Sequence, residues 1–343
     1  MKLLGATPAE LAELVDCSEA EARRVLAWLI SQGQAELKGM KRPVSKAVRA
    51  RIEAHDWSRP RVLTRVEDPV DHSLRYLFEL HDGHRVEAVR IPLEKPGRFT
   101  VCLSSQVGCA MRCDFCATGR LGLSRNLEAA EILGTWLTVR DEAPGRVTGT
   151  VFMGQGEPFH NYDEVLRAAS TLAHPCGGRI SAKNITISTV GLVPQMQRFA
   201  QERRPFRLVL SLSSARPERR RQLLPIASRW SLDELAEALR QVQRVQGRRM
   251  TLAWVLIAGV TDHPDEVRGI ARHFGDLPLR INLIDVNEAR VEGYQRASQA
   301  QRDAFVDALQ ALEVPVVRRY SVGATQNSAC GMLASTFVEE GCA

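Results

Sequence analysis

The most constraining feature of the sequence is a group of cysteines in one short stretch, residues 102–125, which reads CLSSQVGCAMRCDFCATGRLGLSR. Cys109, Cys113 and Cys116 follow one another there in the spacing C-x3-C-x2-C. Iron–sulfur clusters are held by cysteine thiolates, normally four of them. Three thiolates can hold a four-iron cluster and leave one iron open to chelate a small molecule, and the known partner of such an iron is S-adenosylmethionine. Phe115, directly before the last cysteine, is expected to shield the cluster from water.

Two other interpretations of these cysteines stay open: a structural zinc site, and buried thiols that act as small hydrophobic side chains. Zinc sites usually take four ligands from paired short spacings. The chain of 343 residues has eight cysteines, no long apolar run and no signal-like N-terminus. We therefore expect a cytoplasmic protein without a membrane span, in which cysteines serve metal binding or catalysis and not a disulfide framework.

Residues 1–55 are predicted to form a small helical accessory domain. Thr7 is a candidate N-cap of the first helix, an apolar stripe predicts a second helix from Ser18 to Gln32, and Gly33 is placed to end it. Basic side chains over residues 38–51 are expected either on a solvated helix face or on a surface that contacts an RNA backbone.

Residues 56–97 are predicted to form a β-rich connector, because apolar and polar residues alternate along them. The pattern indicates antiparallel strands, with Asp82 and Gly83 at a hairpin turn. Glu87 lies near the end of the last of these strands, where a lone glutamate usually faces solvent.

From residue 98 to residue 343, apolar strand-like segments alternate with helical ones, one of which begins with a candidate capping box of Ser231 and Glu234. Six or seven such units predict an α/β fold with a parallel sheet, either open or curved into an incomplete barrel. In such barrels the chemistry lies at the carboxyl ends of the strands. The residues at these predicted ends are the cysteine loop, the turn at residues 154–158, and Ser188, Thr189, Ser211, Leu212, Ser213 and Asn287. Ser188, Ser211 and Asn287 could cap the strands or bind the hydroxyl, adenine and carboxylate groups of a ligand, and we favour the ligand.

The turn at residues 154–158, which reads GQGEP, is a second candidate element of a ligand site. Gly156 would let the backbone approach a ligand, and Glu157 with nearby backbone groups would bind its ammonium and carboxylate. An ordinary strand-to-helix turn is the alternative. The turn lacks the third glycine of a dinucleotide-binding fingerprint.

The basic residues are only weak evidence that the protein binds a nucleic acid. The formal net charge is +6, which is compatible with RNA binding but common in other proteins. A cluster of arginines follows a predicted strand near the mouth of the predicted barrel, where we expect phosphate contacts in preference to a solvated charge run. The members of this cluster are Arg216, Arg219, Arg220 and Arg221.

Five blocks of sequence together resemble the RlmN/Cfr family of radical S-adenosylmethionine enzymes, which methylate an adenosine of large-subunit ribosomal RNA. The blocks are CLSSQVGCAMRCDFCATGRLGLSRNL, FMGQGEP, ITISTVGLVP, INLIDVN and SACGML, in that order. The resemblance runs from about residue 71 to residue 334. It implies an incomplete (β/α)6-type radical S-adenosylmethionine barrel over residues 98–343 with a catalytic cysteine in a C-terminal loop, preceded by a β-hairpin extension and the helical domain. It also implies methyl transfer to C2 or C8 of an adenine, in 23S ribosomal RNA at the peptidyl-transferase centre.

The resemblance further implies a two-stage route, because C2 and C8 of adenine are electron-poor. Cys330 first takes a methyl group from S-adenosylmethionine, and a [4Fe-4S] cluster on the three cysteines reduces a second molecule to a radical that activates this methyl for addition to the ring. Cys102 then releases the protein–RNA adduct by a transient disulfide with Cys330, and Glu87 is the proton acceptor. The residues implied to bind S-adenosylmethionine are Gly156, Glu157, Ser188, Ser211, Leu212, Ser213 and Asn287.

The sequence departs from the family pattern on the substrate side. Ser213 stands where histidine is usual, Asp285 and Glu288 stand where prolines are usual, and residues 323–327 lack an Asp-Ile pair. The implied partners are ribosomal or transfer RNA and an electron donor such as flavodoxin or ferredoxin, and we expect a monomer. The alternatives are the same machinery acting on a different RNA or on a non-RNA substrate, and a zinc-stabilised RNA-binding module without activity.

Overall fold

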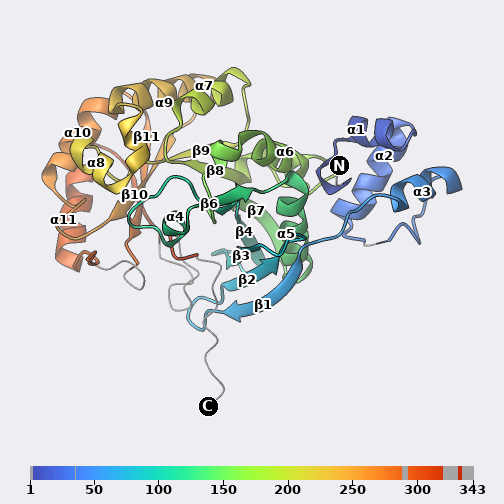
Figure 1. Ribbon diagram of the computed structural model, residues 1–343. Helices are drawn as coiled ribbons and strands as arrows, with labels where there is room; N and C mark the ends of the chain where they lie inside the picture. The colour runs from blue at the N-terminus through green and yellow to red at the C-terminus, as the bar shows by residue number, and fades with distance from the viewer. Residues whose placement is uncertain (1–2, 35, 288–292, 320–330, 334–343) are drawn as a thin grey trace, which may run out of the picture.

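A single large sheet organises the protein (Figure 1). The structure is a computed structural model that describes residues 3–34, 36–287, 293–319 and 331–333. In this part of the chain, ten strands follow the order β1-β2-β3-β4-β7-β8-β9-β10-β11-β12, and a separate two-stranded ribbon pairs β5 with β6. Cys330 and Glu288 lie outside the described residues.

Three short helices form the N-terminal lobe, which Figure 1 shows beside α5 and α6. They are α1 (Pro8–Leu14), α2 (Glu19–Leu26), which continues into a π-helical turn (Ala27–Ser31), and α3 (Lys46–Glu53). Thr7 and Ser18 cap the first two helices in capping boxes, as the sequence predicts for Thr7. Leu3, Leu11 and Leu26 belong to the same hydrophobic cluster as the core of the large sheet, so the lobe is packed onto the rest of the molecule.

The β-rich segment extends the large sheet at one edge. Its strands β1 (Arg61–Glu67), β2 (Leu74–Glu79) and β3 (Arg85–Pro92) are antiparallel, and β3 also pairs with β4 (Arg98–Leu103) in antiparallel fashion. The predicted hairpin is confirmed, with Gly83 at a φ of +81°. The segment is therefore continuous with the strands that follow.

The strands from β4 onward run parallel and confirm the α/β barrel prediction. After β4 they are β7 (Arg146–Phe152), β8 (Ile185–Thr189), β9 (Arg207–Ser211), β10 (Met250–Leu256), β11 (Leu279–Asp285) and β12 (Val316–Arg319). β1 and β12 each have a strand neighbour on one side only, so the sheet stays open as an incomplete barrel.

Amphipathic helices cover the outer side of this barrel, as Figure 1 shows for α7, α9, α10 and α11 around the later strands. The helices are α5 (Ala129–Asp141), α6 (Tyr162–Ala173), α7 (Val193–Gln201), α8 (Pro217–Leu223), α9 (Leu232–Gln246), α10 (Pro264–Phe274) and α11 (Gln299–Gln310). The predicted capping box of Ser231 and Glu234 is present at the start of α9. None of the described helices is long and apolar enough to cross a membrane.

The cysteine loop contains more regular structure than the sequence predicts. A short ribbon of β5 (Gln106–Gly108) and β6 (Leu123–Asn126) encloses it, and α4 (Ala117–Leu121) follows the last cysteine. Gly108 has a φ of +75°, and a Cβ there would overlap the carbonyl oxygen of Gly122. Strands of three and four residues are too short to show a periodicity, which is why the sequence pattern does not reveal them.

Candidate active site

Hydrogen bonds between loops lock the carboxyl ends of β4 and β7 to the antiparallel strand β3. Ser105 donates its N–H to the carbonyl of Gln155 at 2.7 Å, and Gln155 donates its N–H to the Ser104 hydroxyl at 3.0 Å. Ser104 in turn donates to the carbonyl of Glu87 at 2.6 Å. The cysteine loop, the GQGEP turn and the strand that carries Glu87 are therefore held in one place, as the predicted convergence of these elements requires.

The three cysteines lie close together at this edge of the sheet. Cys109 and Cys113 are buried, and Cys116 is half-buried directly before α4. Burial raises the pKa of Cys109 to about 12 and that of Cys113 well above its usual range, and the charges of the neighbouring thiolates raise both further. Thiolates in this position therefore need a bound cationic group to stabilise them.

An iron–sulfur cluster fits these residues. In the described residues no three His, Cys, Asp or Glu side chains are arranged as ligands of one metal ion. A four-iron cluster binds each thiolate through a different iron, so the three sulfurs need not meet at a single point. The buried, mutually repelling thiols and the spacing C-x3-C-x2-C agree with that group.

Glycine is required at position 156 because neighbouring residues of the protein leave no space for a Cβ there. Its φ is +98°, and a Cβ there would lie 2.6 Å from the Cβ of Gln106 and 2.7 Å from the hydroxyl oxygen of Ser105. The sequence predicts a close approach of the backbone to a ligand at Gly156, whereas the structure shows an approach to the start of the cysteine loop. Contact of Gly156 with a ligand stays a prediction.

Glu157 is buried next to the cysteines, with its carboxylate held by backbone groups. Its Oε1 accepts the N–H of Phe159 at 2.9 Å, and its Oε2 accepts the N–H of Val190, just after β8, at 2.9 Å. Burial raises the pKa of Glu157 to about 7, although these hydrogen bonds oppose the shift. A ligand ammonium placed here would favour the ionised carboxylate.

The other residues implied to bind S-adenosylmethionine lie at neighbouring strand ends. Ser188 is on β8, Ser211 is the last residue of β9, and both are half-buried, as is Asn287 two residues after β11. Leu212 is fully buried, so its backbone is the part that can face a ligand. Ser213 has a φ of +58°, and its buried hydroxyl has no hydrogen-bond partner among the described residues.

Glu87 and Cys102 share one face of the sheet. Cys102 pairs with Val89 across β4 and β3, and Glu87 lies two residues from Val89, so all three side chains point to the same side. Glu87 is buried, with its Oε1 3.5 Å from Nη1 of Arg75. The interpretation of Glu87 as a solvent-facing strand residue is therefore wrong, because the neighbouring strands and loops cover it.

The segment directly after Cys330 lies against the cysteine loop. Ala117 of α4 donates its N–H to the carbonyl of Gly331 at 2.8 Å, and Thr118 donates its hydroxyl to the carbonyl of Leu333 at 2.6 Å. Leu333 also forms a small hydrophobic cluster with Val89 and Cys102.

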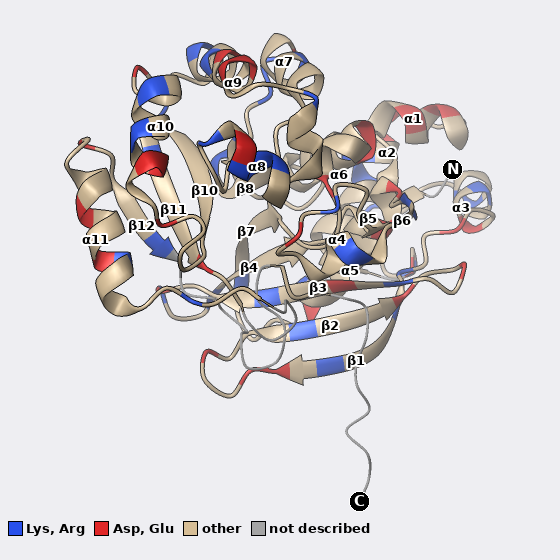
Figure 2. Ribbon diagram, turned by 60° about the vertical axis from the view of Figure 1, so that its left-hand side comes forward, with Lys and Arg blue, Asp and Glu red and all other residues tan. Residues whose placement is uncertain are grey.

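The arginine cluster after β9 is only partly available to an RNA. Arg221 is exposed, and Arg216 and Arg219 are half-buried, but Arg220 is 2% exposed. The predicted phosphate contact is therefore wrong for Arg220, because helix α8 turns that side chain into the protein. The ribbon in Figure 2 shows acidic and basic residues interspersed along α8, α9 and α10.

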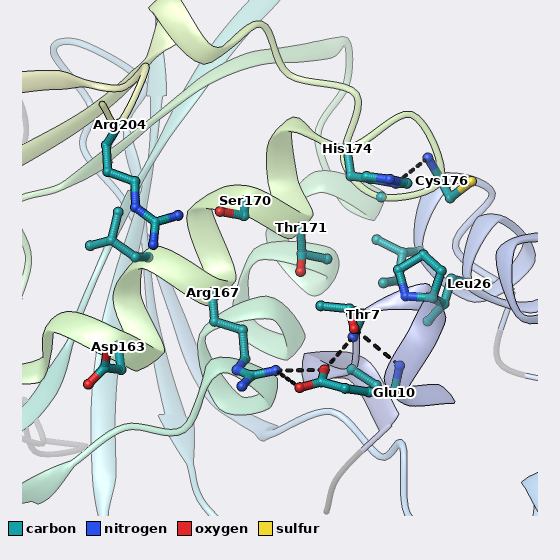
Figure 3. A pocket seen from close by; sticks show the side chains of 15 residues that line it. Thr7, Glu10, Leu26, Asp163, Arg167, Ser170, Thr171, His174, Cys176 and Arg204 are labelled. Carbon is teal, nitrogen blue, oxygen red and sulfur yellow. Dashed lines mark hydrogen bonds and ion pairs between the residues drawn. The ribbon is translucent and has the colours of Figure 1, made fainter. Parts of the chain in front are cut away.

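A separate cavity of about 330 Å³ lies between the N-terminal lobe and α6 (Figure 3). Arg167 of α6 donates to both carboxylate oxygens of Glu10 at 2.7 Å, and Thr7 donates its N–H to Glu10 at 2.8 Å. On the other side His174 accepts the N–H of Cys176 at 3.1 Å. The cavity contains none of the predicted site residues.

Comparisons with known proteins agree with this geometry. Residues 103–271 match the Radical SAM superfamily. A probable RNA methyltransferase of Anaeromyxobacter sp. (strain Fw109-5) is 47% identical over 340 residues, which cover 98% of this chain and 99% of that protein. A probable dual-specificity RNA methyltransferase RlmN of Heliobacterium modesticaldum (strain ATCC 51547 / Ice1) is 36% identical over 96% of this chain and 89% of that protein.

A solved structure shows the same similarity in three dimensions. A radical SAM methyltransferase from Sphaerobacter thermophilus has a TM-score of 0.90 and 34% sequence identity, with coverage of 98% of this chain and 100% of that one. The similarity spans the N-terminal lobe, the β-rich segment and the barrel, and so confirms the resemblance inferred from the sequence blocks. The chain therefore belongs to the RlmN family of radical S-adenosylmethionine methyltransferases.

Proposed function

We propose that this protein methylates C2 or C8 of an adenine in RNA, with Cys330 as the residue that carries the methyl group. The observation that carries the proposal is the position of residues 331–333, which hydrogen-bond to α4 next to Cys116 and pack on Cys102. Cys330 is the residue directly before this segment in the sequence. Relatives named as RNA methyltransferases support RNA as the substrate.

The cofactor would be held by the residues already described. Cys109, Cys113 and Cys116 would bind a [4Fe-4S] cluster, and Glu157 would bind the ammonium of S-adenosylmethionine. When bound, these groups supply a radical that activates the methyl group, at the expense of one electron from a donor such as flavodoxin or ferredoxin. The buried surroundings of Cys109 and Glu157 would exclude water from this reaction.

The two further cysteines would make and break the bond to the methyl group. The Cys330 thiolate would displace the methyl from the sulfonium of S-adenosylmethionine. After the activated methyl carbon has bonded to the adenine ring, the Cys102 thiolate would attack the Cys330 sulfur and form a disulfide. The bond between that sulfur and the transferred carbon breaks, its electron pair stays with the carbon, and the carbon takes up a proton to complete the methyl group. Glu87, on the same face as Cys102, would accept the proton that the ring carbon loses.

The RNA would approach from the open edge of the barrel and present one unstacked adenine. α3 in the N-terminal lobe carries exposed basic residues. Arg49 and Arg51 of α3 are each paired with a carboxylate, of Glu53 and Asp16, respectively, at 2.7 Å and 2.6 Å. Lys46 on the same helix is in none of the ion pairs found in the described part of the chain, which makes it the stronger candidate for a phosphate contact on α3.

The test is the variant Cys330→Ala, with Cys176→Ala as a matched control far from the cysteine loop. Cys330→Ala should stop methylation of RNA but leave reductive cleavage of S-adenosylmethionine to 5′-deoxyadenosine. Mass spectrometry of nucleosides measures the first reaction and chromatography of 5′-deoxyadenosine the second. Normal RNA methylation by Cys330→Ala would refute the proposal.

The alternative is that the same machinery acts on another substrate. Mass spectrometry of nucleosides from fractionated RNA distinguishes this alternative from the proposal. Ribosomal and transfer RNA from cells with and without the gene should differ at one methyladenine, and the fraction that differs identifies the target. A gene-dependent change in neither fraction would favour a non-RNA substrate. Colourless protein that contains zinc after anaerobic purification would support the non-enzymatic zinc module instead.

A further inference from the structure

Arg220 is a buried cation that pairs with no carboxylate in the described part of the chain. It lies on α8 and is 2% exposed. Its Nε has no hydrogen-bond partner in the same part of the structure. Removing a charge from water costs several kcal/mol unless another group compensates for it, so a guanidinium in this position calls for a functional reason.

The two terminal nitrogens of Arg220 join two strand ends of the active site. Nη1 donates to the carbonyl of Leu212, just after β9, at 2.8 Å, and Nη2 donates to the carbonyl of Val190, just after β8, at 2.6 Å. The N–H of Val190 donates to Glu157 at 2.9 Å. One guanidinium thus connects the ends of β8 and β9, and through Val190 it also connects them to the GQGEP turn after β7.

The turn after β9, to which Arg220 donates a hydrogen bond, has a strained backbone and is also stabilised by contacts with α10. Ser213 has a φ of +58°, a conformation that persists in a non-glycine residue only where the surroundings enforce it. From α10, Glu266 accepts the hydroxyl of Ser214 at 2.9 Å and the N–H of Ala215 at 2.7 Å. The segment from Ser211 to Ala215 is therefore set in place before any ligand binds.

Arg220 is also next to the cysteine loop. Asp114, between the last two cysteines, donates its N–H to the carbonyl of Leu223 at the end of α8 at 3.0 Å. A cluster bound by three thiolates carries negative charge, and local charge is one of the factors that set the reduction potential of such clusters.

We propose that Arg220 is a positioning residue that holds the ends of β8 and β9 at the separation S-adenosylmethionine requires, and that its unneutralised charge favours reduction of the cluster on Cys109, Cys113 and Cys116. The inference rests on the radical chemistry of the family. It depends neither on RNA as the substrate nor on the role of Cys330, so it can be tested when those assignments fail.

The experiment compares Arg220→Met and Arg220→Lys with Arg221→Gln in the cluster-loaded enzyme. Arg221 is the matched control because it is the next residue of α8, is exposed and pairs only with Glu218 among the described residues. The dissociation constant of S-adenosylmethionine and the midpoint potential of the cluster are both measured anaerobically at pH 7, with iron content and circular dichroism as checks of folding.

Arg220→Met should weaken binding of S-adenosylmethionine at least tenfold and lower the midpoint potential. A tenfold change in the reduction equilibrium is about 59 mV for one electron. Arg220→Lys should restore the potential, because an ammonium keeps the charge, but should not restore binding, because it lacks the planar fork that reaches two carbonyls. Arg221→Gln should change neither quantity.

Three results would overturn the proposal. If Arg220→Met kept the wild-type affinity for S-adenosylmethionine and the wild-type midpoint potential, Arg220 would neither position the strand ends nor influence the cluster. An equal fall of the midpoint potential in Arg220→Lys and Arg220→Met would show that the charge of Arg220 does not favour reduction of the cluster. Failure of both variants to fold would show that Arg220 is a core residue of the barrel and not a residue of the site.

Discussion

The hydroxyl of Thr118 donates a hydrogen bond of 2.6 Å to the carbonyl of Leu333, across a separation of 215 residues. Thr118 lies in the helix that begins directly after Cys116, and Leu333 lies three residues after Cys330. The bond therefore ties the segment that follows the proposed methyl carrier to the loop that would hold the cluster. Leu333 packs on Cys102 as well, so the same short segment contacts both the cysteine loop and β4.

Thr118→Val should slow RNA methylation while cleavage of S-adenosylmethionine stays at the wild-type rate. The variant keeps the shape of the side chain but leaves the carbonyl of Leu333 without this donor, which costs about 1–3 kcal/mol for a buried group. The matched control is Thr135→Val, because Thr135 is also buried but donates only to Ile132 within its own helix. Equal methylation rates in Thr118→Val and Thr135→Val would contradict the proposed role of this contact.

Cys102→Ala should trap the protein on its RNA. Without the Cys102 thiolate, no disulfide can form with Cys330 and the bond to the methylated adenine persists. Denaturing gels with and without ribonuclease detect the adduct as a band of reduced mobility. Cys17→Ala is the control, since Cys17 lies in the N-terminal lobe. Release of free methylated RNA from Cys102→Ala at the normal rate would count against the assignment.

Gly156→Ala should reduce the iron content of the purified protein far more than Gly83→Ala. Both glycines have a positive φ, of +98° and +81°, so both substitutions carry about 1–2 kcal/mol of backbone strain. A Cβ at Gly83 meets nothing within 4 Å, whereas at Gly156 it would press on Gln106 at the start of the cysteine loop. Iron and sulfide assays with thermal unfolding of both variants measure the difference, and equal iron content would argue against this coupling.

Glu266 should make the stability of the protein fall as the pH rises. Burial raises the pKa of Glu266 to about 7 from its ordinary value of 4.5, so the protonated form is favoured in the folded state. The stabilisation is complete below pH 4.5, is lost as the pH rises to 7 and stays constant above that. Relative to Glu266→Gln, the wild type should lose about 2–3 kcal/mol of unfolding free energy between pH 5 and pH 8. Denaturant titrations at the two pH values measure this, and parallel behaviour of both proteins would show that Glu266 is not perturbed.

The sequence alone determined the parts of this protein that depend on short-range spacing. The cysteine spacing indicated the cluster, the alternation of strands and helices predicted the incomplete barrel, and Thr7 and Ser231 marked helix starts that the structure confirms. These signals are readable because ligand spacing, capping and periodicity each involve residues within a few positions of one another.

Only the tertiary structure decided which charged residues are buried and which distant segments meet. Glu87 lies in an ordinary strand sequence and Arg220 in a run of arginines. Yet Glu87 is covered by the strands and loops around β3, and Arg220 is turned inward by α8 to reach the ends of β8 and β9. Leu333 reaches Cys102 and Thr118 through contacts that span more than two hundred residues. Burial and pairing of this kind arise from the packing of elements remote in sequence, so the local pattern of residues carries no record of them.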